Sequence, residues 1–334
     1  MRSFRWKEAG HRILAWYCHP ERLMKAIFLE REPHRVILIA ANPKSGATDQ
    51  RRLVEALAER LRQDGYPVEI ITDLTLLSER IQSLEATDGI EVVIGAGGDG
   101  TASAVVSRMG PSTPFLPFPL GTENLLARQY GIRADIEQAS ALIKQRKYRT
   151  LDAGLANDQL FLLMVGVGFD AEVVRCVHEN RTGHIHRSMY WNAILKMVWS
   201  YRFPEMVISL HSEHPMQGTK PPSVEGVTRT ACWLFVANQP CYGGGLKIAP
   251  WANPQDGLLD VCTFRHGGFW RGLMYLTMLR WQRHTRLKDF EASMATSLQI
   301  DSSSAIAYQI DGDLGGTLPL TIRLIRNRYC MIVP

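Results

Sequence analysis

The sequence lacks several features that would define its class at once. No run of 18 apolar residues occurs in its 334 positions, so no stretch has the length of a membrane-spanning helix. The six cysteines form no C-x-x-C pair and no metal spacing, which predicts reduced thiols in a cytoplasmic protein. The formal net charge of +5 is too small to indicate a nucleic-acid partner, although it suits an anionic membrane surface or a polyphosphate.

Glycine is concentrated in one stretch, residues 91–101, which read EVVIGAGGDGT. A short apolar run predicts a buried strand, and a small-residue segment after the glycines predicts a helix. Backbone N–H groups in such a turn can approach an anion, and the helix dipole favours negative charge. The residues expected to hold phosphate are Gly97, Gly98, Gly100 and Thr101. Asp99 lies among them, and because a carboxylate would repel phosphate, it indicates a bound cation or a hydroxyl partner.

Two glycine patterns, at 95–100 and 166–171, also match the dinucleotide fingerprint G-x-G-x-x-G/A. That fingerprint needs an acidic residue about 20 positions later, at the end of the next strand. The apolar run at 115–120 carries no carboxylate, and no clear strand precedes Glu179. Each match is therefore as compatible with a structural turn as with a cofactor loop.

The pattern of apolar runs divides the chain into two domains. Between 35 and 150, strand-like runs alternate with helical spacing, which predicts a doubly wound, Rossmann-like α/β domain. Between 151 and 334, short strand patterns dominate, which predicts an antiparallel β-sandwich or barrel-like domain. The strands expected there are 151–155, 159–165, 205–211, 228–238, 257–264, 297–300, 306–310 and 320–324, with helical insertions at 188–201 and 269–283.

Three segments combine apolar and basic residues. Residues 1–34 form a basic amphipathic extension, expected either to pack on the fold or to anchor at a membrane interface. In the insertions at 188–201 and 269–283, aromatic and aliphatic residues alternate with Arg and Lys. Such helices suit a bilayer surface as well as a protein core, so we expect peripheral membrane association.

Seven motifs follow one another along the chain. They are ANPKSG at 41–46, GGDGT at 97–101, PLGTEN at 119–124, GFDA at 168–171, YGGG at 242–245 with IAP at 248–250, DGLLDV at 256–261 and DGD at 311–313. In this order they resemble the diacylglycerol kinase catalytic family, in its bacterial and sphingosine-kinase-like branch, which is distantly related to NAD kinases. The resemblance covers residues 34–334 and implies an NAD kinase/diacylglycerol kinase-like fold with the active site between two domains.

The resemblance implies an ATP-dependent lipid kinase that phosphorylates a diacylglycerol or sphingoid-type hydroxyl at the membrane surface, with ATP and Mg²⁺ as cofactors. Thr72, Thr122 and Asn124 would then face the nucleotide. Asn42 and Gly46 would shape the adjoining wall.

Two carboxylates are the catalytic candidates. Asp99 would lie near the γ-phosphate and its Mg²⁺, so we expect Asp99→Asn to abolish transfer and to leave stability nearly unchanged. Asp313 stands where the resembling family carries a Glu that acts as base for the lipid hydroxyl. A solvated Asp-Gly-Asp turn is the alternative account of residues 311–313.

The loop at 253–258 resembles a structural Mg²⁺ site of the same family. Its ligands would be the Asp256 side chain and the backbone carbonyls of Asn253 and Leu258. Oxygen ligands suit Mg²⁺, but a plain Asp-Gly turn explains the same residues.

Departures from the family pattern keep other functions open. Leu125 and Ser103-Ala104 stand where many relatives carry acidic or amide side chains. A soluble kinase closer to NAD kinases and a non-catalytic nucleotide or lipid sensor are therefore the alternatives. The identity of the lipid and the formation of a homodimer stay open.

Overall fold

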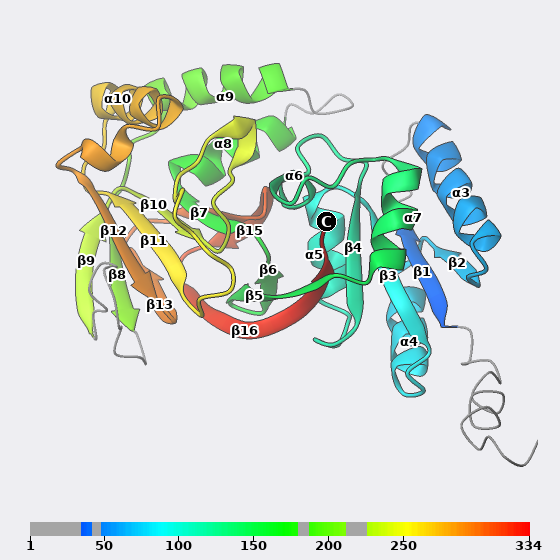
Figure 1. Ribbon diagram of the computed structural model, residues 1–334. Helices are drawn as coiled ribbons and strands as arrows, with labels where there is room; N and C mark the ends of the chain where they lie inside the picture. The colour runs from blue at the N-terminus through cyan, green and yellow to red at the C-terminus, as the bar shows by residue number, and fades with distance from the viewer. Residues whose placement is uncertain (1–34, 42–47, 180–186, 212–225) are drawn as a thin grey trace, which may run out of the picture.

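The computed structural model describes residues 35–41, 48–179, 187–211 and 226–334. The predicted extension at 1–34 and two predicted wall residues, Asn42 and Gly46, lie outside these ranges. Within them the chain forms an α/β domain and a β-sandwich domain, which confirms the predicted fold class (Figure 1). No helix in the described ranges is both long enough and apolar enough to cross a membrane.

Four parallel strands in the order β2-β1-β3-β4 form the centre of the first domain. Every residue of β3 is buried, because helices α3 and α7 cover one face of the sheet and α4 and α5 the other. The elements are β1 (Val36–Ala41), α3 (Thr48–Gln63), β2 (Val68–Ile71), α4 (Leu74–Glu85), β3 (Ile90–Gly97), α5 (Asp99–Val106), β4 (Pro114–Pro119), α6 (Leu125–Gln129) and α7 (Ile136–Gln145).

The second domain packs two sheets face to face, and their inner side chains form one apolar core. One sheet has the order β12-β11-β10-β7-β14-β15 and is antiparallel throughout. The elements are β5 (Tyr148–Ala156), β6 (Gln159–Phe161), β7 (Met164–Gly168), α8 (Phe169–Glu179), α9 (Arg187–Ser200), β8 (Met206–His211), β9 (Val227–Ala231), β10 (Trp233–Ala237), β11 (Leu259–Phe264), α10 (Phe269–Arg280), β12 (Phe290–Ala295), β13 (Ser297–Asp301), β14 (Ala307–Ile310), β15 (Asp313–Thr317) and β16 (Leu320–Ile332), with short 3₁₀ turns at Gly243–Gly245 and His284–Arg286.

Strand β16 joins the two domains. It pairs in parallel with β4 and antiparallel with β5 and β13, so one ten-stranded sheet runs through both domains. The predicted strand 320–324 is only its first part. Arg326, Asn327 and Arg328 interrupt the apolar alternation, and the pairing with β5 shifts between Ile325 and Tyr329, which explains why the pattern ended early.

Further strand predictions need correction. The single strand expected at 159–165 is two strands, β6 and β7, which belong to different sheets. The single strand expected at 228–238 is two strands, β9 and β10, which belong to different sheets and are separated at Cys232. Strands β12 and β15 were not predicted. The sequence of β15, DLGGT, has two glycines and therefore weak strand propensity; pairing with β14 holds it extended.

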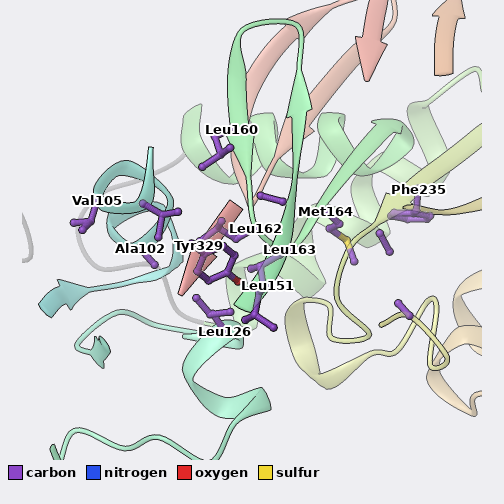
Figure 2. Packing of buried hydrophobic residues seen from close by; sticks show 14 of the residues in the cluster. Ala102, Val105, Leu126, Leu151, Leu160, Leu162, Leu163, Met164, Phe235 and Tyr329 are labelled. Carbon is purple, nitrogen blue, oxygen red and sulfur yellow. The ribbon is translucent and has the colours of Figure 1, made fainter. Parts of the chain in front are cut away.

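One continuous apolar core contains side chains from both domains (Figure 2). Tyr329 of β16 is fully buried between Leu126 of α6 and Leu162 and Leu163, which precede β7. Ala102 and Val105 of α5 belong to the same cluster. The helix that follows GGDGT is thus held against both domains.

Candidate functional site

A cavity of about 510 Å³ lies between the domains, and its two ends differ in chemistry. Gly98, Gly100, Thr122, Asn124 and Asp313 line the polar end. The other end is formed by apolar side chains from α8, α9, β10 and α10. These include Phe169, Val173, Val174, Ile194, Trp233, Phe235, Leu276 and Leu279.

The GGDGT turn presents the start of α5 to this cavity. Gly98 is the N-cap residue and has no side chain to cap the helix, so backbone N–H groups of the first turn can bind an anion. Gly97 and Thr101 are not among the lining residues in the described ranges. They support the turn instead, because a Cβ on Gly97 would lie 2.3 Å from Thr101 Oγ1.

The PLGTEN loop packs directly on this turn. A Cβ on Gly121 would lie 2.5 Å from the Cα of Gly98, so only glycine allows the two loops to approach so closely. The Asn124 side chain accepts from Gly121 N (2.9 Å) and donates to Gly121 O (2.7 Å). Asn124 lines the cavity, but these bonds engage its side chain in holding the loop closed, and its assignment to the nucleotide stays a prediction.

Asp99 is half-buried, and its carboxylate is bonded to backbone. Its carboxylate accepts the N–H groups of Leu125 (2.9 Å) and Leu126 (3.0 Å), the first residues of α6. Burial raises the pKa of Asp99, and these two bonds lower it. The expectation that Asp99→Asn leaves stability unchanged must therefore be revised, because this carboxylate satisfies the open end of a helix.

The Asp-Gly-Asp turn brings the second catalytic candidate to the same place. Asp313 is exposed at the start of β15, and a Cβ on Gly100 would lie 3.0 Å from its Oδ2 atom. Asp99 and Asp313 thus line one cavity, although they are far apart in the sequence. Two carboxylates beside an open helix N-terminus are a donor set that suits Mg²⁺ when phosphates supply further oxygens.

Asp311 has a different role from Asp313. It is half-buried and accepts the N–H groups of Leu162 (2.8 Å), Leu163 (2.9 Å) and Met164 (3.0 Å). Ser103 donates its hydroxyl to Asp311 Oδ2 at 2.6 Å, so this departure from the family pattern has a structural function. Burial raises the pKa of Asp311 to about 6, against the effect of these bonds.

Sequence reasoning missed a buried carboxylate that lines the cavity. Asp170 in the first turn of α8 is 3% exposed and accepts hydrogen bonds from Tyr242 Oη and from Gln309 Nε2 (2.8 Å). Burial raises the pKa of Asp170 to about 7, and the bond from Gln309 lowers it. The GFDA and YGGG motifs contain two of these residues, but only the fold brings them to Gln309.

Thr72 is not brought into this cavity. It follows β2 and lines a separate open groove with Glu69, Leu76 and Arg80. Thr72 lies at the same edge of the sheet as GGDGT, with β1 between them. Its assignment to the nucleotide stays a prediction.

The loop predicted to bind a structural Mg²⁺ closes on itself. Asp256 N donates to Asn253 O (3.3 Å) and Leu258 N donates to Asp256 Oδ1 (3.1 Å). Arg326 Nη2 donates to Gly257 O at 3.4 Å, which places a positive charge beside the loop. The metal assignment of Asn253, Asp256 and Leu258 stays a prediction, and the nearby guanidinium works against it.

The apolar end of the cavity lies beneath an exposed aromatic surface. Helices α9 and α10 lie side by side, and α9 covers α8 (Figure 1). Trp199 and Trp270 are each 78% exposed, and Trp281 is 64% exposed. The exposed cations Lys196 and Arg280 accompany them on the same two helices. We call these tryptophans and cations the α9–α10 surface.

Two family models match the chain along most of its length. The diacylglycerol kinase catalytic domain matches residues 35–156, and the YegS C-terminal NAD kinase beta sandwich-like domain matches residues 163–332. Among curated relatives, the diacylglycerol kinase of Bacillus subtilis is 26% identical over 84% of this chain and 90% of its own length. That of Mycobacterium tuberculosis is 25% identical over 90% of this chain and 96% of its own length.

The fold also matches solved structures. A diacylglycerol kinase from Bacillus anthracis covers 91% of this chain and 99% of its own, with a TM-score of 0.66 at 19% sequence identity. At that identity the likeness concerns the fold alone. The first family model ends with strand β5 and the second begins at Leu163, so that together they include the residues of the cavity described above. They show that the chain belongs to the diacylglycerol kinase catalytic-domain family, with a C-terminal domain of the NAD kinase-like β-sandwich type.

Proposed function

We propose that this protein transfers the γ-phosphate of ATP to a hydroxyl group of a membrane lipid, of the diacylglycerol or sphingoid type. One observation carries the proposal: a single cavity joins the open end of α5 to a chamber lined by aromatic and aliphatic side chains. An acceptor that fits both ends has a polar head and a long apolar chain. The names of the curated relatives support the same class of substrate.

The residues at the polar end have distinct parts in this proposal. The N–H groups at the start of α5 and the glycines at 98 and 100 would bind phosphate oxygens. Asp99 would help to hold Mg²⁺, which would neutralise charge on the phosphates when it is bound. Asp313 would accept the proton of the lipid hydroxyl as that oxygen bonds to the γ-phosphorus and the bond to the β-phosphate oxygen breaks, releasing ADP.

The α9–α10 surface supports access from a bilayer. Exposed tryptophans beside Lys and Arg are typical of proteins that rest on an anionic membrane. These helices also form walls of the apolar chamber, so an acyl chain would have a short path from the bilayer into the cavity.

A transfer assay tests the proposal against its alternatives. Purified protein with Mg²⁺ and γ-³²P-labelled ATP is offered diacylglycerol, sphingosine or NAD, with the lipids in anionic vesicles. We expect label in a lipid product and none in NADP. Label in NADP alone would establish the soluble NAD kinase-like activity, and ATP binding with no labelled product would establish the sensor. The apolar lining of the cavity is the observation that disfavours NAD as acceptor.

A further inference from the structure

A chain of hydrogen bonds connects Asp170 with the turn that carries Asp313. Gln309 of β14, which is 1% exposed, donates from Nε2 to Asp170 Oδ2 at 2.8 Å. The Oε1 atom of the same amide accepts the N–H of Gly312 at 2.7 Å. Gly312 directly precedes Asp313. One side chain therefore spans the space between the buried carboxylate and the turn.

The orientation of the Gln309 amide is determined by its two partners. A carboxylate can only accept, and a backbone N–H can only donate, so a rotated amide would lose both bonds. Asp170 is fixed in turn by Tyr242 Oη and by its position in the first turn of α8. The fold makes room for it with glycine, because a Cβ on Gly166 would lie 1.9 Å from Asp170 Oδ2.

The backbone of the 311–313 turn has an unfavourable conformation that hydrogen bonds must stabilise. Gly312 has a φ of +92° and Asp311 a φ of +49°, so two consecutive residues adopt left-handed backbone. Asp311 binds the backbone at 162–164 on one side of the turn. Gln309 accepts the N–H of Gly312, the residue between Asp311 and Asp313. This hydrogen bond therefore holds the backbone directly before Asp313.

We propose that Asp170 is a positioning residue that, through Gln309, holds the 311–313 turn so that the Asp313 carboxylate stays beside Gly100. The proposal rests on the proposed function, in which Asp313 accepts the proton of the lipid hydroxyl. Asp170 itself transfers no proton in that reaction. Its role is to keep the acceptor of the proton in register with the end of α5.

Gln309→Met tests the connection. Methionine has a similar length and fills the site, but it removes both hydrogen bonds. Gln299→Met, at an exposed position of β13 in the other sheet, is the matched control. Backbone amide hydrogen exchange in residues 311–314 should be about tenfold faster in Gln309→Met, as the loss of one hydrogen bond implies, and unchanged in Gln299→Met. Unchanged exchange in both variants would overturn the proposal, whether or not the protein transfers phosphate.

Kinetics test whether the effect passes through Asp313. Gln309→Met should lower kcat on the lipid by about tenfold to hundredfold, the cost of misplacing a reacting group, with the KM for ATP nearly unchanged. In an Asp313→Ala background the same change should cause little further loss, because the group it positions is gone. If the fold-losses in kcat of the two single variants multiply in the double variant, the two residues act independently and the positioning role is refuted.

A paired swap separates this role from a general loss of stability. In Asp170→Asn combined with Gln309→Glu, the new amide can donate to the new carboxylate, which still accepts from Gly312 N. Gln309→Glu alone should be strongly impaired, and the pair should recover at least part of kcat and of the exchange protection. No recovery in either measurement would count against the proposal. If hydrogen exchange changes in Gln309→Met but the wild type transfers no phosphate, the proposed function is rejected, and the finding that Gln309 stabilises the 311–313 turn remains.

Discussion

The carboxylate of Asp313 lies against the backbone of Gly100, so close that a methyl group on Gly100 would be 3.0 Å from Asp313 Oδ2. Gly100 belongs to GGDGT and to the first turn of α5, and Asp313 belongs to a strand of the second domain. Their contact is the point where the end of α5 that is proposed to bind phosphate meets the group proposed to activate the acceptor. It makes the two domains parts of one site.

Gly100→Ala should separate activity from stability. The added methyl group would displace the mobile end of Asp313 and narrow the approach to the helix terminus. In a helix, Ala is more favourable than Gly by up to about 1 kcal/mol, so thermal stability should be unchanged or slightly higher. We expect phosphate transfer to fall at least about tenfold. Full activity would show that Gly100 and Asp313 need not approach each other during catalysis.

Asp313→Ala should lower kcat by about 10²- to 10⁴-fold, the range for the loss of general acid–base catalysis, with ATP binding little affected. Asp313→Glu tests the fit of the shorter acid. If the site tolerates the length found in relatives, Glu will retain or increase activity; if Gly100 leaves room only for Asp, it will be slow. Wild-type transfer by both variants would assign the base to another residue.

Asp99→Asn should reduce both transfer and stability. The amide can still accept from one of the N–H groups of Leu125 and Leu126, but its NH₂ group would face the other. Weakening a helix cap costs about 0.5–2 kcal/mol, which chemical denaturation can measure. The control is Asp158→Asn, which changes an exposed turn. If Asp99→Asn is inactive but as stable as the wild type, the Asp99 carboxylate contributes through its charge alone, as first expected.

Stability should depend on pH through Asp170. Its pKa is raised to about 7 by burial, so between about pH 4 and pH 7 the folded state binds more protons than the unfolded state. Stability therefore falls as pH rises through this window, by at most about 1.4 kcal/mol per pH unit for one group. Asp170→Asn should lose this slope and gain stability relative to wild type at pH 7.5. If the free energy of unfolding depends on pH in the same way for both proteins between about pH 4 and pH 7, the raised pKa of Asp170 is contradicted.

Vesicle binding should depend on the α9–α10 surface. Trp199→Glu with Trp270→Glu should abolish sedimentation with anionic vesicles, because both exposed side chains would become charged. Leu76→Glu, a change of an exposed leucine on α4 in the other domain, is the control. Binding by the wild type should weaken as salt rises. Retained binding by the double variant would place the membrane contact elsewhere.

The confirmed predictions of the fold rest on patterns within short segments of the sequence. Strand-helix alternation and the GGDGT turn are properties of short segments, and they gave the α/β domain and the open end of α5. The contacts that complete the site are not local. Asp99 finds its partners 26 and 27 residues away, and Gln309 is 139 residues from Asp170. Their partners are backbone amides and a buried amide side chain, which leave no signature in the sequence.

The path of β16 has a consequence for how the protein is made. This strand follows all the other described strands in the chain, yet it lies between β4 and β13 and pairs with β5. During synthesis the α/β half therefore leaves the ribosome with an open sheet edge at β4, and it cannot close that edge until the whole sandwich has been translated. The α/β half, although it precedes the sandwich in the sequence, would be among the last parts to reach its native state.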